Sequence, residues 1–425
     1  MLSPLREHLR DTFWFAPVAA MVVVFVVWWA CAGIDREIVE SLQEDGEYEA
    51  VADLVAIARD AQTVVTTVSS AMMTFIGVVF SISLVAVQMA SGQFSPRVVR
   101  IFVRSRITKA TLAVFLSTFL LSLLVLTSYE SDTDPRLVTS VPLLQSILTL
   151  LMVGLSLLLF VAYVNAMLRL MRVSHVVDRI TQESFRVLMK TPWYEGEGGD
   201  LGPVTGHVVH RGRAGVLRDV NVARLVRAAR RHGLVLRLLP RIGDFVVPGT
   251  PILAVHGGAA PRGLASSVSV GIERTFHQDL GFGLRQLADI GLRALSPAVN
   301  DPTTAVQCLD RITQFLAALA RRPLGAVVYR DGRGGAGAVR LVQDVPGWTD
   351  LVDLGFAELR ACATASPQVS RRMLAGFDDL LSLVPEERRA PLLRHRALLV
   401  ELVERAVPSA ADRDFALEAD RQGIG

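Results

Sequence analysis

Four long apolar segments within the first 172 residues constrain the fold of this chain more than any other feature of its sequence. They run from Phe15 to Ile34 and over about 62–91, 110–128 and 141–168. Each is close to the roughly 20 residues that a helix needs to cross the hydrocarbon core of a bilayer. Since that core offers the backbone no hydrogen-bond partners, such segments must be helical. The sequence therefore predicts a domain of four transmembrane helices over residues 1–172.

The charges that flank these segments predict their orientation. Residues 91–109 hold five basic side chains and no acid, whereas residues 35–60 hold nine acids against Arg36 and Arg59. Lys and Arg are retained on the cytoplasmic side of a membrane. We therefore expect both termini in the cytoplasm and an acidic outer loop over 35–60. An apolar stripe through Val51, Val55 and Ala58 indicates that the second helix begins within this segment.

The second apolar segment carries polar and small residues at regular spacing. One row recurs every seven residues from Thr67 to Ser95, and another from Thr63 to Ser91, with Leu84 at one of its positions. A seven-residue repeat keeps both rows on one narrow side of a helix. The side chains on this side within the segment are our candidate pore-lining residues: Thr63, Thr67, Ser70, Thr74, Gly77, Ser81, Gln88 and Ser91.

Two interpretations of this polar side remain open. Small residues and hydroxyls commonly serve helix packing in membranes, where they allow close approach and hydrogen bonds between helices. Alternatively, copies of this helix surround water and present a hydroxyl every one or two turns. Gln88 favours a pore, because a primary amide is costly in hydrocarbon unless it meets water or a partner. No ionised residue lies within the span, so a channel would be passive.

A basic segment follows this helix. Ser95 and Pro96 are a favourable N-cap and first residue of a new helix. If the segment is helical, Arg97, Arg100 and Arg104 share one face. They would either contact anionic lipid headgroups or form a basic ring at the inner mouth of a pore.

After residue 172 the pattern predicts a cytoplasmic α+β region with a small barrel-sandwich-like β module and a helical C-terminal part. Turn signals at Gly243-Asp244 and Pro248-Gly249 punctuate the module, which resembles biotinyl and lipoyl domains. Those domains carry their cofactor on a lysine, and this module has none, so the resemblance implies a shape and no carrier role. The predicted parts are a helical extension and linker (173–200), the module (201–260), a helical corner region (261–322), a hairpin (323–346), three helices (347–406) and a mobile tail (407–425).

The helical corner contains "SPAVNDPTTA", residues 296–305. A helix over 279–295 ends at Ser296-Pro297, and the next begins with Asp301 as N-cap and Pro302 at its first position. The free N–H groups at such a helix start would bind an anion, although Asp301 competes for them. The candidate ligand-binding residues at this corner are Arg285, Arg293, Asn300, Asp301, Thr303 and Thr304.

The sequence gives no support for an enzyme, a metal site or a cofactor. It contains no nucleophile elbow, P-loop or zinc-protease motif. His207 and His210 lie three apart on a predicted strand and point to opposite faces, which is unfavourable for one metal. The three cysteines fit no metal spacing, and a net charge of +3 does not favour a nucleic-acid partner.

Three stretches carry a family resemblance: "TFIGVVFSISLVAVQMASGQFSPRVVRIF" (74–102), "GDFVVPGTPI" (243–252) and "FGLRQLADIGLRALSPAVNDPTTA" (282–305). Together they resemble the bacterial predicted membrane proteins of domain of unknown function twenty-two fifty-four. The resemblance extends over about residues 10–400 and implies the architecture; the location that we expect is a bacterial inner membrane. The resemblance implies no activity, so it supplies no catalytic residues.

Two functional hypotheses follow. In the first, the chain forms a homo-oligomeric passive ion channel or pore, lined by the second transmembrane helix and gated or filtered by the cytoplasmic region. In the second, it is a membrane-anchored sensor or scaffold that binds a ligand or partner near the corner at 296–305. Membrane lipids are expected partners in both cases.

Overall fold

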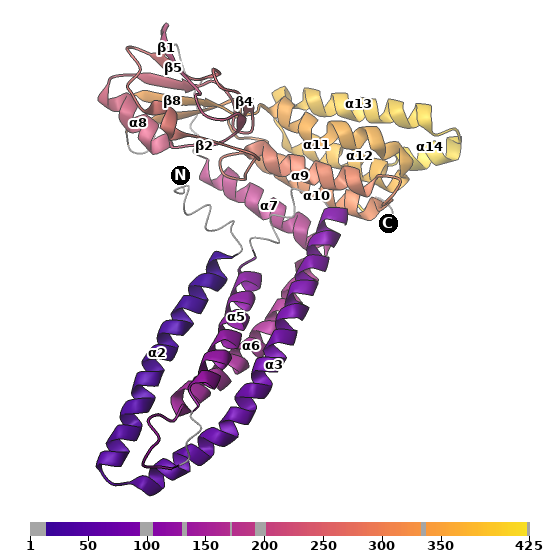
Figure 1. Ribbon diagram of the computed structural model, residues 1–425. Helices are drawn as coiled ribbons and strands as arrows, with labels where there is room; N and C mark the ends of the chain where they lie inside the picture. The colour runs from indigo at the N-terminus through magenta and orange to yellow at the C-terminus, as the bar shows by residue number, and fades with distance from the viewer. Residues whose placement is uncertain are drawn as a thin grey trace. The chain divides into compact units, whose positions relative to one another are not determined.

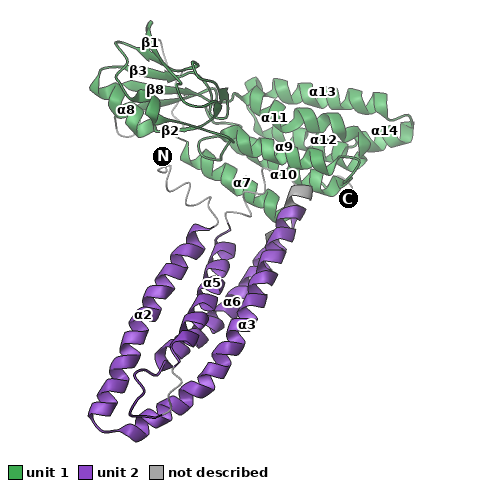
Figure 2. Cartoon of the chain, viewed as in Figure 1, with its two compact units in different colours: residues 1, 93–95, 173–425 green, residues 2–92, 96–172 purple. Residues whose placement is uncertain are grey.

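The computed structural model describes residues 14–93, 105–129, 134–170, 172–191, 201–332 and 337–422; the side chains of residues 90–93 and 170 are outside that description. The chain divides into two compact units (Figure 2). The N-terminal unit comprises residues 2–92 and 96–172, and the C-terminal unit comprises residues 93–95 and 173–425 together with Met1. Each unit has its own core, so each is described by itself.

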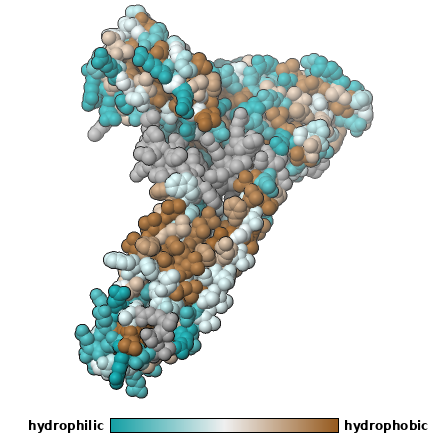
Figure 3. Space-filling model, viewed as in Figure 1, coloured by the Kyte–Doolittle hydropathy of each residue, from teal (hydrophilic) through white to brown (hydrophobic). Residues whose placement is uncertain are grey.

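The N-terminal unit consists of four long helices (Figure 1). Each contains a stretch long and apolar enough to cross a membrane, so the described residues include four candidate spans at the four predicted segments. Hydrophobic side chains gather over these helices, and hydrophilic ones cover the end of the unit where the first two helices are joined (Figure 3). The helices are α2 (Phe15–Glu44), α3 (Tyr48–Gln93), α5 (Arg106–Thr127) and α6 (Leu143–Leu170).

The predicted outer loop 35–60 is instead two helix ends. Helix α2 continues to Glu44, a turn occupies only residues 45–47, and α3 starts at Tyr48. The apolar stripe explains this extension, because Val51 and Ala58 pack with Val39 of α2 in a small buried cluster. At about 1.5 Å per residue, the 46 residues of α3 span about 69 Å.

A buried polar network ties three helices of this unit together. The Asp35 carboxylate of α2 accepts hydrogen bonds from the Leu144 amide (2.9 Å), and from the Gln145 side chain (3.0 Å). Asp35 therefore caps the N-terminus of α6, where free N–H groups favour a negative charge. Ser128, just after α5, donates to Gln145 Oε1 (2.9 Å), and Trp28 of α2 donates to Ser128 (3.3 Å).

The β module of the C-terminal unit contains two sheets and one helix, α8 (Val222–Arg231). The first sheet has the order β1-β5-β3-β8-β7, and the second has the order β4-β2-β6. Leu236, Leu253 and Leu341 of the first sheet share a core with Leu217 of the second and Leu225 of α8. The strands are β1 (Val204–Val209), β2 (Gly215–Val220), β3 (Val235–Leu238), β4 (Phe245–Val246), β5 (Pro251–His256), β6 (Val268–Gly271), β7 (Ala326–Arg330) and β8 (Val339–Asp344).

The barrel-sandwich expectation for this module is not confirmed, since the described strands form two sheets and no closed barrel. The predicted hairpin over 323–346 exists as the antiparallel pair β7–β8, but it is part of the module rather than a separate element. Strand β8 pairs in parallel with β3, with Leu236 opposite Leu341. The hairpin therefore supplies hydrogen bonds to an edge of β3 that would otherwise lack a partner.

The helical part of the C-terminal unit is packed through glycines at its helix crossings. A Cβ at Gly283 of α9 would overlap the Ser184 hydroxyl of α7, and one at Gly355 of α11 would lie 2.8 Å from Ile312 of α10. Both glycines allow a close approach that a side chain would prevent. The helices are α7 (Val173–Lys190), α9 (Leu280–Ala294), α10 (Pro302–Leu319), α11 (Trp348–Cys362), α12 (Pro367–Leu383), α13 (Arg389–Ala406) and α14 (Ala410–Leu417).

Helix α14 lies within the segment predicted as a mobile tail. Arg371 of α12 donates hydrogen bonds to the Phe415 carbonyl (2.9 Å) and to Asp420 (3.1 Å). Its guanidinium also stacks over the Phe415 ring at 4.2 Å. The buried arginine therefore attaches residues 410–420 to the helical core, an attachment that the composition of the tail did not indicate.

Candidate functional site

The polar face of α3 consists of Thr63, Thr67, Ser70, Thr74, Gly77, Ser81 and Gln88, and all seven residues are exposed. The eighth candidate, Ser91, lies on α3, but its side chain is outside the described residues. The structure thus places the seven described candidates together on one exposed face, whose members contact no other helix closely enough to be buried.

The packing face of α3 also repeats every seven residues. It consists of Val51, Ala58, Val65, Met72, Val79 and Ala86, each at most 4% exposed. At about 100° per residue, Thr67 and Ser70 lie about 200° and 140° around the helix from Val65. The polar face is therefore centred opposite the packing face. Within this chain, α3 is held by its apolar side and presents its polar side outward.

Aromatic contacts and one buried tyrosine fix α3 through its packing side. Tyr163 of α6 is fully buried, and its hydroxyl donates to the Val79 carbonyl at 2.9 Å. The same hydroxyl lies 2.6 Å from Ser83 Oγ. Phe75 of α3 contacts Phe115 of α5 and Phe160 of α6, with ring centroids 6.2 and 5.4 Å apart. These contacts set the rotation of α3 about its axis.

The hydrogen bonds on the polar face change along its length. Thr67 Oγ1 donates to the Thr63 carbonyl (2.9 Å), and Ser70 Oγ donates to the Thr66 carbonyl (3.2 Å), so these hydroxyls bond within their own helix. Among the described residues, Thr74, Ser81 and Gln88 make no side-chain hydrogen bond. The Gln88 amide therefore presents two donors and an acceptor to whatever surrounds α3.

A second set of hydroxyls, which sequence reasoning missed, lies inside the unit on α5. Thr108, Thr111 and Ser117 are buried, and their hydroxyl oxygens have no partner among the described residues. Thr118 is also buried and lies 3.1 Å from Ser156 of α6. The spacing of Thr108 and Thr111 by three, one helical turn, was the available signal. These hydroxyls face neighbouring helices, so their position is that of packing residues.

The three arginines predicted at the inner mouth, Arg97, Arg100 and Arg104, lie outside the described residues. The structure therefore contributes no geometry for a basic ring or for lipid contacts by these side chains. The last described residue before them is Gln93, the end of α3.

The corner at 296–305 is a capped helix–helix turn. Asn300 has φ of +48°, a left-handed conformation that asparagine tolerates better than most residues. The Asp301 carboxylate accepts hydrogen bonds from the Thr304 amide (3.0 Å) and hydroxyl (2.6 Å). Asp301 thus occupies donors that an anion would need, while Thr303 is exposed beside it.

The two arginines assigned to this corner do not converge on it. Arg285 donates two hydrogen bonds of 2.8 Å to the Glu358 carboxylate of α11 and one of 2.7 Å to Asp289. Glu358 thereby raises the pKa of Arg285, and the arginine holds the pKa of Glu358 below its usual range. Arg293, in the last turn of α9, has a buried Nε without a partner among the described residues. The six candidates therefore do not form one site.

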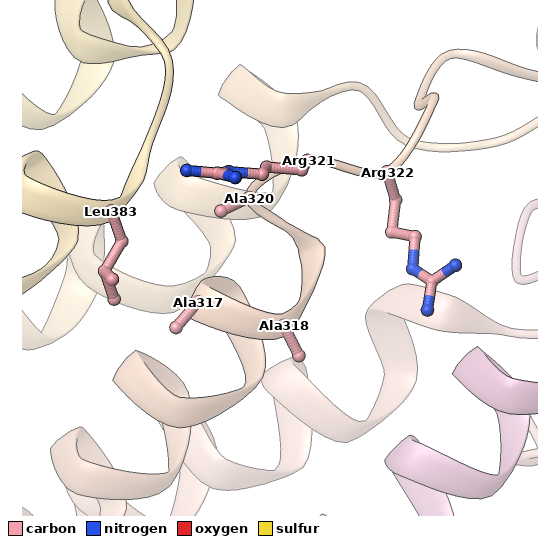
Figure 4. Close-up of a pocket in the computed structure, with 6 residues that line it drawn as sticks. All are labelled: Ala317, Ala318, Ala320, Arg321, Arg322 and Leu383. Atoms are coloured by element: carbon pink, nitrogen blue, oxygen red, sulfur yellow. The ribbon is translucent and has the colours of Figure 1, made fainter.

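A pocket of about 390 Å³ lies elsewhere, at the C-terminal end of α10. Ala317, Ala318 and Leu383 form its apolar lining, and Figure 4 shows that the side chains of Arg321 and Arg322 extend in different directions. This divergence does not suit a single small anion. No group of three or more potential metal ligands occurs in the part of the chain that the structure describes.

Comparison with known proteins gives a consistent classification. The profile of a family described as predicted membrane protein (DUF2254) matches residues 10–379. An uncharacterized protein of Mycobacterium tuberculosis, Rv1290c, is 29% identical over 383 residues, which cover 85% of this chain and 70% of the relative. The uncharacterized protein Mb1321c of Mycobacterium bovis matches with the same identity and coverage. No solved structure matches the chain.

Proposed function

The chain belongs to this family of predicted membrane proteins, and we propose that it forms a homo-oligomeric passive ion channel or pore. In this proposal α3 lines the conducting path, and the C-terminal unit gates or filters it. The path is passive because no ionised side chain is found on the polar face of α3. The proposal includes no catalytic activity.

One observation carries the proposal: α3 already packs into its own bundle, and its polar face points the other way. The Thr74 and Ser81 hydroxyls and the Gln88 amide, which make no side-chain hydrogen bond among the described residues, would remain unsatisfied if they faced lipid. Several copies of α3 arranged around an axis would satisfy these groups with water. The packing faces need not change, because they are opposite the proposed lumen.

The proposed setting is a bacterial inner membrane that the chain crosses four times, with both termini in the cytoplasm. Support comes from the five basic side chains of residues 91–109 and the nine acids of residues 35–60. The turn between α2 and α3 would then lie on the outer side.

A second candidate function is a membrane-anchored sensor or scaffold, in which the polar face of α3 packs against the same face of another copy. The observation that favours it is Arg293, whose Nε, near the corner at 296–305, has no partner among the described residues. A single arginine beside an occupied helix cap is weaker support than seven aligned residues, so the channel is the first proposal.

Single-channel recording in planar bilayers tests the channel, with the wild type beside Gln88→Leu. Leucine preserves approximate size and removes the amide, so we expect discrete wild-type currents and loss or rescaling of unit conductance in the variant. Val85→Leu is the matched control, because Val85 is exposed on α3 three residues away and lies off the polar face. This control should conduct like the wild type.

The oligomeric state of each protein is measured in the same preparation by native gel or light scattering. If the wild type is assembled and silent across voltage and membrane tension, the channel proposal is wrong. If Gln88→Leu instead reduces assembly without any current in the wild type, the result favours the scaffold.

A further inference from the structure

Helix α8 presents an unusual concentration of arginine on the surface of the β module. Asn221 caps the helix by accepting a hydrogen bond from the Arg224 amide (3.0 Å). Leu225 and Ala229 are fully buried in the module core, which fixes the orientation of the helix. The residues that face outward include the four α8 arginines, all exposed: Arg224, Arg227, Arg230 and Arg231.

The four α8 arginines lie together on one short helix and have no acidic partner among the described residues. Many other arginines of the unit pair with carboxylates; examples are Arg285 with Glu358, Arg340 with Asp331, and Arg371 with Asp420. None of the α8 arginines forms an ion pair with a described residue. Their hydrogen bonds are to the backbone, from Arg224 to the Gly263 carbonyl (3.3 Å) and from Arg227 to the Ala223 carbonyl (3.1 Å).

The surrounding sequence does not neutralise the helix. Residues 201–270 contain ten arginines against only Asp219 and Asp244. The overall charge of the chain is only +3, so the positive charge of this module is large compared with that of the whole chain. Such a surface attracts a polyanion, because clustered guanidinium groups raise the local potential and bind phosphate oxygens well.

We infer that the α8 arginines bind the anionic phospholipid headgroups of the membrane that the same chain crosses. The positive charge of the α8 arginines complements the negative charge of these headgroups, since juxtamembrane basic clusters bind anionic lipids. The module also follows the last candidate membrane span after a short stretch of chain: between the end of α6 at Leu170 and β1 at Val204 lie α7 and its flanking segments. This tether keeps the module near the bilayer at high effective concentration.

A nucleic-acid partner is less well matched to this surface. Residues 221–233 contain no Phe, Tyr or Trp on which an unpaired base would stack. The inference concerns a surface separate from α3, so it holds whether or not α3 lines a pore.

Energy transfer in nanodiscs tests the inference on the full-length chain. A donor dye is attached at Ala223→Cys, an exposed position on α8, in a Cys362→Ser background. The other two cysteines, Cys31 and Cys308, are buried and are not expected to react. The acceptor is a dye on lipid headgroups. We expect transfer to increase when phosphatidylglycerol replaces part of the phosphatidylcholine, and to fall again at high salt.

The deciding variant is Arg224→Gln, Arg227→Gln and Arg231→Gln combined. Each arginine near an anionic surface strengthens binding by about fivefold, so removing three should weaken it by about a hundredfold and abolish the lipid-dependent transfer. The matched control removes three other exposed arginines without ion pairs, Arg321, Arg322 and Arg389, and should retain the transfer.

Three outcomes would overturn the inference. The first is wild-type transfer that does not depend on lipid charge. The second is an equal loss in the control variant, which would show a response to net charge alone. The third is absence of lipid dependence together with RNA binding that the α8 substitutions remove, which would assign the surface to nucleic acid.

Discussion

The two opposite faces of α3 follow the same seven-residue repeat, yet they are made of different residues and have different surroundings. The packing face is apolar and buried against α2, α5 and α6, whereas the polar face is exposed. If α3 were surrounded by water, burial of its apolar side chains would be enough to account for the packing of this face. In lipid it gains only from fit, because hydrocarbon is as apolar as the side chains. The polar face is therefore the one that needs a partner outside this chain.

The largest difference between the two faces is expected when the same charge is placed on each. Val79 and Ser81 are two residues apart, with Val79 buried and Ser81 exposed. Val79→Asp should destabilise the bundle by about 3 kcal/mol or more, because an unpaired carboxylate would be buried among helices. Ser81→Asp should cost less than about 0.5 kcal/mol if its surroundings are wet. Unfolding in mixed detergent micelles measures both values.

Ser81→Asp also carries a functional consequence. A ring of carboxylates in a water-filled path favours cations, so the variant should shift the reversal potential in a salt gradient toward cation selectivity. Equal destabilisation by the two substitutions would mean that the polar face is as dry as the packing face, and the pore would have to be abandoned.

A smaller effect is expected from Tyr163→Phe, which tests how the packing face is held. The change removes the hydrogen bond to the Val79 carbonyl and the contact with Ser83 while the ring remains. We expect a loss of about 1 kcal/mol in bundle stability. Thr74→Val, on the polar face, should leave the stability of the single chain unchanged. A Tyr163→Phe protein as stable as the wild type would argue against the rotation of α3 described above.

The smallest expected effect is a pH dependence in the C-terminal unit, where a buried polar group is only partly satisfied. Burial lowers the pKa of His395 below its ordinary value of 6.5, although Asp353, at 2.7 Å from Nε2, favours the charged form. The other ring nitrogen, Nδ1, is buried and has no partner among the described residues, so protonation would bury an unpaired N–H. Arg360 and Arg394, which also face this histidine, oppose its positive charge.

The sign of this effect follows from the lowered pKa. As the pH falls below 6.5, the unfolded chain takes up a proton that folded His395 resists, so stability decreases on acidification. Asp353, whose pKa is held low by His395 and Arg394 against the effect of burial, contributes only at more acidic pH. Thermal unfolding of the wild type and His395→Gln between pH 7.5 and about 5 checks this. The prediction is wrong if both lose stability equally.

Local sequence signals predicted individual helices and caps well but failed for distant pairing. Asp301 with Pro302 fixed the start of α10, because capping involves neighbouring residues. The strand pair Leu236–Leu341 joins residues more than a hundred positions apart, and neither strand's pattern specifies its partner. From the sequence, β7 and β8 therefore look like a separate hairpin, although β8 pairs in parallel with β3 and extends its sheet.

The candidate site, too, could be predicted only in part from local sequence signals. The repeat placed the polar residues of α3 on one side, but it did not show which apolar side of α3 packs. In a transmembrane helix, lipid-facing and protein-facing residues are both apolar, so hydropathy does not distinguish them. At the corner, the sequence could not show that Glu358, on a different helix, engages Arg285.

The length of α3 suggests a position at which the protein can be labelled. At about 69 Å, it is about twice as long as a hydrocarbon core of about 30 Å is thick, so we expect the turn at its start, which precedes the apolar span, to extend beyond the bilayer surface. Gly46 in that turn has φ of +76° and open space around its Cα. An epitope tag inserted there would be reachable by antibody in spheroplasts, from which the outer envelope has been removed, if the turn is outside, and it would leave both faces of α3 untouched.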